Sequence, residues 1–251
     1  MSYKIFLVLI LPFTAFLIFF TDSNTELFLA INQSGKAFPD IFWEILTTFG
    51  NKPFVLTVLF LVTWKKPDLL VSALIASIFA GLISSTLKPL FDLARPTDIL
   101  NISSYHLIGA KISGHSFPSG HTMSAFAVAS SLIFFYKKSF VTVTMFLLAS
   151  LVGLSRIMLG VHWPIDVLIG ATLGLACAYL GVQLVLHPWL RLKEHKLKSS
   201  VVNMLYLLLS LKLFLTGTGY ASVQGMVLVI AILGIGLGIA LILYRLRKNI
   251  G

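Results

Sequence analysis

Two histidines and one aspartate near the middle of the sequence could carry out nucleophilic and acid–base chemistry. His162 and Asp166 are four residues apart, so the carboxylate can accept the ring N–H, fix the tautomer and raise the nucleophilicity of the imidazole. Pro164 lies between them and predicts the first turn of a helix, where the helix dipole favours an acidic side chain. His121 can exchange protons near neutral pH.

Positively charged side chains and a helix start in the same region could hold a phosphate group. Lys88 and Arg95 are seven residues apart, a spacing that predicts positions two turns apart on one helical face. Arg156 adds a third cation, and Ser119 and Gly120 predict a helix start whose free N–H groups bind anions. Such groups would neutralise a phosphoryl group while one histidine attacks it and the other protonates the departing oxygen.

Each of these groups also has an ordinary structural explanation. Lys88 and Arg95 could lie at the membrane interface, as cations at the ends of membrane helices do. Ser119 could simply cap a helix, and Asp166 could stabilise a helix dipole beside an unrelated His162. The occurrence of all these groups within one stretch of the chain favours a phosphate site.

The composition is that of a helical membrane protein. Of 251 residues, 57% are hydrophobic and only 11% are charged, whereas soluble proteins contain roughly 25% charged residues. The net charge of +10 would suggest a nucleic-acid partner in a soluble protein, but the chain has too little polar surface for one. The single cysteine, Cys177, excludes an internal disulfide framework and a multi-thiolate metal site.

The apolar stretches predict an all-α transmembrane bundle of eight spans, six in a core and two at the C-terminus. Residues 21–50 mix acidic and aromatic side chains and predict an interfacial segment, whereas residues 92–117 predict a polar loop. The predicted spans are 4–20, 53–64, 69–87, 119–136, 140–159, 164–186, 201–216 and 225–244.

The basic residues predict the orientation of these spans. One face would carry twelve Lys and Arg against two acidic residues, and the other six against seven, while Lys212 lies within the seventh span. The positive-inside rule places the first face, which includes both termini, in the cytoplasm. The two histidines and the candidate phosphate-binding residues are then expected on the outer face.

Three motifs closely resemble the signatures of the type-2 phosphatidic acid phosphatase superfamily. In chain order they are Lys88-x6-Arg95-Pro96, Pro118-Ser119-Gly120-His121 and Ser155-Arg156-x5-His162-x3-Asp166. The resemblance covers residues 1–186 and implies a six-span lipid phosphatase core. A basic cytoplasmic linker, 187–200, and a two-span C-terminal extension, 201–251, follow it. We expect the extension to pack, to oligomerise or to shape substrate access.

The resemblance implies a role for each candidate residue. His162 would be the nucleophile, held by Asp166, and His121 would be the general acid and then the base that activates water. No metal or other cofactor is implied, and the outer face offers no compact carboxylate cluster for Mg²⁺. The residues that would hold the phosphate are Lys88, Arg95, Ser119, Gly120 and Arg156.

The function implied by the resemblance is that of a lipid phosphatase in a bacterial cytoplasmic (inner) membrane, with its site on the periplasmic or outer side. Undecaprenyl pyrophosphate is the foremost expected substrate, followed by phosphatidylglycerophosphate and phosphatidate. Membrane lipids are the expected partners, nucleic acid is not, and the oligomeric state stays open. One alternative is a lipid A phosphatase or phosphotransferase that uses the same site. A more distant one is a non-catalytic lipid or ion transporter.

Overall fold

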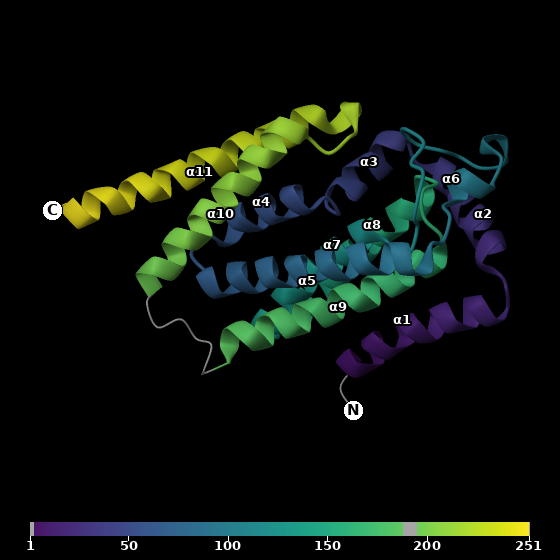
Figure 1. Cartoon of the computed structure of the whole chain (residues 1–251), viewed down its shortest axis with the longest axis horizontal. Coiled ribbons are helices and arrows are strands. Elements are labelled where there is room, and N and C mark those ends of the chain that lie inside the picture. The colour runs from purple at the N-terminus through teal and green to yellow at the C-terminus, as the bar shows by residue number, and fades with distance from the viewer. Residues whose placement is uncertain (1–2, 188–194, 251) are drawn as a thin grey trace.

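The computed structural model describes residues 3–187 and 195–250, and all regular elements in these residues are helices (Figure 1). The predicted all-α class is therefore confirmed. Residues 188–194 of the predicted linker lie outside the described residues, and residues 195–200 belong to a helix. The elements are α1 (Tyr3–Phe20), α2 (Asn24–Ser34), η1 (Gly35–Ala37), α3 (Asp40–Thr48), α4 (Lys52–Thr63), α5 (Pro67–Phe91), α6 (Pro96–Ile99), η2 (Ile102–Ser104), α7 (Gly120–Tyr136), α8 (Ser139–Met158), α9 (Pro164–Leu186), α10 (His195–Thr216), η3 (Ala221–Val223) and α11 (Gln224–Ile250).

Five helices in the described residues are long and apolar enough to cross a membrane, or up to seven if each of two bent helix pairs is one span. α3 and α4 form one such pair, bent by 70°. α4 has only 12 residues, which is short of the roughly 20 that a bilayer requires. The predicted second span is therefore joined to part of the predicted interfacial segment. α1 and α2 form the other pair, bent by 114°.

α7 is the central helix of the core and packs closely on α9. An added Cβ at Gly170 of α9 would lie 2.9 Å from the carbonyl oxygen of Ser119, and one at Gly174 would lie 2.6 Å from that of Met123. These glycines let the two backbones approach, as small residues do between membrane helices. The first turns of α7 and α9 are consequently held together at one end of the bundle.

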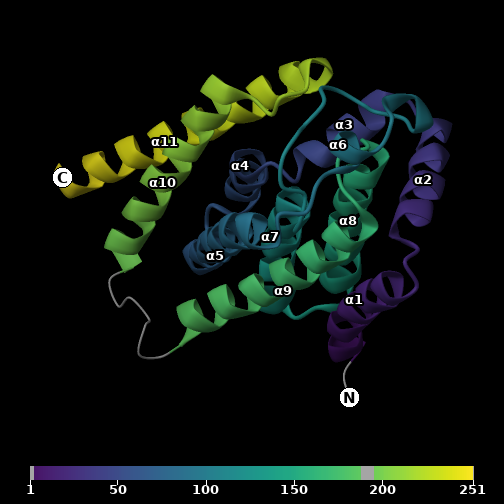
Figure 2. The ribbon, with the colours of Figure 1, turned by 45° about the vertical axis from the view of Figure 1, so that its right-hand side comes forward.

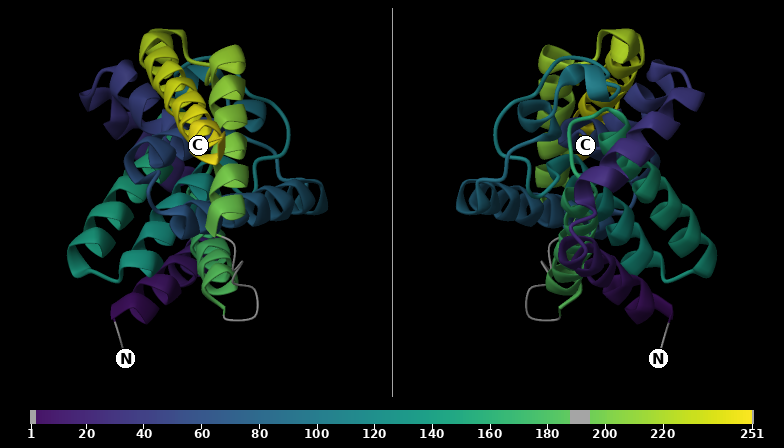
Figure 3. Two further views of the ribbon diagram at one scale, coloured as in Figure 1. Left: turned by 90° about the vertical axis from the view of Figure 1, so that its left-hand side faces the viewer. Right: turned by 90° about the vertical axis from the view of Figure 1, so that its right-hand side faces the viewer.

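α10 and α11 form a hairpin that packs on α4 (Figure 2). Tyr206 of α10 stacks on Phe60 with ring centroids 5.0 Å apart, and its hydroxyl donates to the carbonyl oxygen of Leu70 at 3.1 Å. Viewed along the bundle, the hairpin lies on the opposite side from α1 (Figure 3). The extension is thus packed against the core through buried contacts.

Candidate active site

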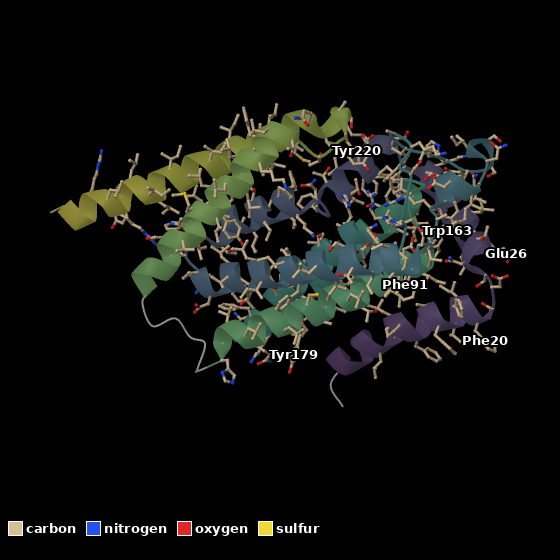
Figure 4. The ribbon with its side chains drawn as sticks, in the orientation of Figure 1. Phe20, Glu26, Phe91, Trp163, Tyr179 and Tyr220 are labelled. Atoms are coloured by element: carbon tan, nitrogen blue, oxygen red, sulfur yellow. The ribbon has the colours of Figure 1, made fainter. Side chains whose placement is uncertain are left out.

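The candidate residues meet at the end of the bundle that lies on the right in Figure 1. α5 and α8 end there, α7 and α9 begin there, and residues 92–117 cross the same end. Figure 4 places Trp163, which precedes α9, and Tyr220, which lies between α10 and α11, at this end as well. Segments far apart in the sequence therefore form one site.

His162 is buried between α8 and α9, and both of its ring nitrogens have partners. Nδ1 lies 3.1 Å from Oδ2 of Asp166 and 3.3 Å from Oγ of Ser116. Nε2 lies 3.2 Å from NH1 of Arg95. Because a guanidinium group can only donate, we assign the proton to Nδ1 and acceptor character to Nε2. Nε2 then carries the lone pair that a nucleophile needs.

Asp166 lies in the first turn of α9, as the sequence predicted, and is buried. Its Oδ2 accepts bonds from the backbone N–H of Trp163 at 2.9 Å and from the hydroxyl of Ser116. Its own carbonyl oxygen accepts the N–H of Ser119 at 3.1 Å. The carboxylate that orients His162 is therefore fixed by two chain segments and tied to the start of α7.

Contrary to the prediction from the sequence, Arg95 does not lie on the helix that carries Lys88. α5 ends just before Asp92, whose φ of 44° lies in the left-handed region, so Lys88 and Arg95 do not share a helical face. That part of the prediction was wrong, because a left-handed residue breaks the helical repeat. Arg95 instead donates from NH1 to the carbonyl oxygen of Val161 at 2.9 Å, while Nζ of Lys88 donates to that of His115 at 2.8 Å.

Ser119, Gly120 and His121 form the start of α7, and Ser119 is its N-cap residue. The Ser119 side chain makes no capping bond to the helix backbone, and its buried Oγ accepts from Oγ1 of Thr122 at 2.9 Å. Gly120 and His121 are both partly exposed. The site therefore remains accessible at His121.

Arg156 is a deeply buried cation, only 2% exposed, whose side-chain partners are neutral. Its NH1 donates to Oγ1 of Thr47 at 2.6 Å and to the hydroxyl oxygen of Tyr220 at 3.2 Å. Within the described residues, the buried Nε atoms of Arg156 and Arg95 have no hydrogen-bond partner. Buried charge and buried N–H groups are costly when unpaired. Two such guanidinium groups therefore indicate a site for an oxyanion such as phosphate.

Similarity to known proteins agrees with this geometry. The profile of the PAP2 superfamily matches residues 69–189. A lipid A 4′-phosphatase of Bacteroides thetaiotaomicron is 30% identical over 169 residues, which cover 62% of this chain and 74% of that protein. The chain belongs to the PAP2 superfamily. An undecaprenyl-diphosphatase of Sulfolobus acidocaldarius is 28% identical over 163 residues, or 64% of this chain and 78% of the relative.

The fold is also that of a solved PAP2 relative. The crystal structure of Aquifex aeolicus LpxE matches with a TM-score of 0.55 and 28% identity, and covers 64% of this chain and 94% of that one. This PAP2 protein is therefore a multi-pass integral membrane enzyme, a hydrolase that acts on lipid phosphates. α10 and α11 lie outside the stretch that matches the profile.

The electrostatics of the PAP2 site favour a neutral imidazole at position 162. Burial, together with the positive charges of Arg156, Arg95 and Lys88, holds the pKa of His162 well below its usual range. A neutral imidazole is the form that can attack phosphorus. The cations that would bind a phosphate therefore also keep His162 unprotonated.

Acidic side chains near the PAP2 site pair with cationic or histidine side chains. Asp92 contacts Nδ1 of His115 at 2.9 Å, and Asp98 lies 3.8 Å from Nζ of Lys111. In the chain as far as it is described, no group of three or more His, Cys, Asp or Glu side chains could hold a metal ion.

Three side chains of the PAP2 site were not predicted from the sequence. Ser116 lies two residues before the Pro-Ser-Gly-His motif, and that proximity was the only available signal. Thr47 lies in the segment predicted to be interfacial, and Tyr220 lies in the C-terminal extension. Neither residue belongs to a spacing pattern that could connect it with Arg156.

Proposed function

We propose that the enzyme removes the terminal phosphate of undecaprenyl pyrophosphate through a phosphohistidine intermediate on His162. The main support for this proposal is that Nε2 of His162 is a hydrogen-bond acceptor and lies near two buried guanidinium groups. Within the described residues, the Nε atoms of these two groups have no hydrogen-bond partner. A phosphate bound by Arg95 and Arg156 would present its phosphorus to Nε2. Lys88 and the start of α7 at Ser119 and Gly120 would bind the remaining oxygens.

The proposed reaction has two steps. Nε2 of His162 attacks the terminal phosphorus, the bond to the bridging oxygen breaks, and His121 donates a proton to that oxygen as the lipid phosphate leaves. His121 then takes a proton from water, whose oxygen attacks the phosphohistidine. The P–N bond breaks and inorganic phosphate is released, while Asp166 stabilises the imidazolium in both steps.

The orientation belongs to the same proposal: both termini in the cytoplasm of a bacterial cell and the site on the outer side of its inner membrane. The distribution of basic residues supports it. In intact cells, with Cys177 replaced by serine, an impermeant maleimide is expected to label a cysteine at position 111 but not one at position 138. The reverse labelling would contradict this orientation.

A phosphate-release panel tests the substrate. The enzyme in detergent is expected to act on undecaprenyl pyrophosphate with a higher kcat/KM than on phosphatidylglycerophosphate, phosphatidate or lipid A phosphates. The lipid A phosphatases among the relatives give the second candidate. A maximum on lipid A, or labelled phosphate transferred to lipid A instead of water, would favour that candidate. Flux through liposomes without any phosphate release would favour a transporter.

The proposed division into a core, 1–186, and an extension, 201–251, gives the extension a positioning role. Tyr220 accepts a hydrogen bond from Arg156 and also packs beside Gly109 of the loop that crosses the site. The hydroxyl of Ser222 donates to Glu44 of α3, which anchors the same connection. The α10–α11 hairpin would thus hold the guanidinium group that binds phosphate.

Removing the hydroxyl of Tyr220 tests this role. Tyr220→Phe keeps the ring but deletes a hydrogen bond to a charged group, which contributes about 1.5–3 kcal/mol. We expect KM to rise roughly tenfold or more, with a smaller change in kcat. Tyr244→Phe, the same substitution at an exposed position of α11, is the matched control. Equal kinetics for the two variants would contradict a role in phosphate binding.

A further inference from the structure

Lys52, the first residue of α4, is a half-buried cation that the proposed reaction does not use. Its Nζ extends to α5, where a Cβ added to Gly81 would lie only 2.8 Å away. Within residues 3–187 and 195–250, its ammonium group has neither a hydrogen bond nor an ion pair. The side chain therefore carries its charge into the bundle without a counter-ion from the described chain.

Lys52 lies close to His121, the proposed proton donor to the leaving group. Gly50, two residues earlier, packs directly on His121, and an added Cβ there would lie 2.7 Å from Cβ of His121. Ser84, about one turn after Gly81 on α5, lies beside the start of α7. The ammonium group is thus about one helical turn farther into the bundle than the start of α7.

The charges around Lys52 do not neutralise it. Lys212 of α10 acts on it electrostatically, and the effect is repulsive. The thiol of Cys177 in α9 also acts on it, and among the described residues no carboxylate does so. An unpaired cation in apolar surroundings is unfavourable. A negatively charged group of a bound molecule would therefore be stabilised beside it.

We infer that Lys52 binds a second phosphate of the substrate, the one that stays on the lipid. The inference rests on the proposed function and narrows it to diphosphate lipids. When the bond to the terminal phosphorus breaks, negative charge develops on the bridging oxygen and its phosphate, and Lys52 stabilises that charge while His121 supplies the proton. A monophosphate ester releases an alcohol, which offers the ammonium group no anion.

Farnesyl diphosphate and farnesyl monophosphate, which share one tail, test the inference as a pair. For Lys52→Met in detergent, the ratio of kcat/KM on the diphosphate to kcat/KM on the monophosphate is expected to fall about 10- to 100-fold, the loss of one charge-assisted bond. Lys36→Met removes an exposed lysine of η1 and is expected to leave the ratio unchanged. Gly81→Ala places a methyl group against Nζ and is expected to lower the ratio by a smaller factor.

Several outcomes would overturn the inference. An equal fall for both substrates would mean that Lys52 has a general structural role, and a fall seen only in phosphatidylglycerol vesicles would mean that it binds bilayer phosphate. Thermal unfolding in detergent controls for folding, and Lys52→Met is expected to retain or raise the wild-type Tm because an unpaired charge is removed. If the wild-type enzyme hydrolyses neither substrate, the proposed function fails instead.

Discussion

His162→Ala is expected to reduce phosphate release by about 10⁶-fold, the loss typical of removing a covalent nucleophile. The reason is geometric: Nε2 of His162 faces NH1 of Arg95 at 3.2 Å, so the lone pair that would attack lies beside a cation that would bind the phosphate. No other described imidazole combines this contact with a buried carboxylate on its second nitrogen. Initial rates on undecaprenyl pyrophosphate in detergent measure the effect.

The control for His162→Ala is His115→Ala, which removes an exposed imidazole near the same end of the bundle. It is expected to keep activity within a few-fold of wild type, and both variants should unfold at temperatures close to that of the wild-type protein. Brief incubation with substrate labelled at the terminal phosphorus should leave an acid-labile label on the wild type but not on His162→Ala. Substantial turnover by that variant would show that another residue is the nucleophile.

Asp166→Asn is expected to lower kcat by about 10⁴-fold, because the amide would stabilise the wrong imidazole tautomer. An amide N–H directed at Nδ1 of His162 would move the ring proton to Nε2. Nε2 would then carry a proton that faces the N–H of Arg95, so two donors would meet. Nε2 would have no lone pair with which to attack phosphorus. In the wild type the same Oδ2 accepts from Nδ1 of His162, Trp163 and Ser116. An amide N–H that faces Nδ1 therefore leaves Trp163 and Ser116 without that acceptor, so thermal unfolding in detergent must show that the variant keeps its fold.

A matched carboxylate separates this effect from a general loss of charge. Asp98→Asn alters an exposed acid of the loop that contacts Lys111 and is expected to change kcat by less than a few-fold. Single-turnover rates for both variants measure the chemical step directly. A loss below tenfold for Asp166→Asn would mean that the carboxylate does not control the tautomer of His162.

Much of the architecture followed from hydrophobic length alone. Each of the eight predicted spans lies on a helix, because an uninterrupted apolar stretch has few alternatives to a helix in a membrane. The number of spans was predicted less well, since five of the described helices, or up to seven with the two bent pairs, are long and apolar enough to cross a membrane. The bend of 70° between α3 and α4, where Gly50 packs on His121, was not predicted, because hydropathy does not report the angle between two helices. The left-handed Asp92, which separates Lys88 from Arg95, also depends on local backbone geometry and was missed.

The contact between His162 and Asp166 was predictable from their spacing of four residues. His162 and Asp166 are joined by one turn at the start of α9, so their hydrogen bond follows from local structure. The partners of Arg156 could not be found this way, since Thr47 and Tyr220 are 109 and 64 residues away along the chain. Tertiary packing alone brings them together.

The neutral partners of Arg156 have a consequence for regulation. Because hydroxyl groups, not carboxylates, hold this guanidinium group, the resting site keeps an excess of positive charge over the single carboxylate of Asp166. We expect inorganic phosphate to be retained there as a competitive inhibitor, with an inhibition constant that rises in Tyr220→Phe. Feedback by its own product would then slow the enzyme whenever phosphate is abundant outside the membrane.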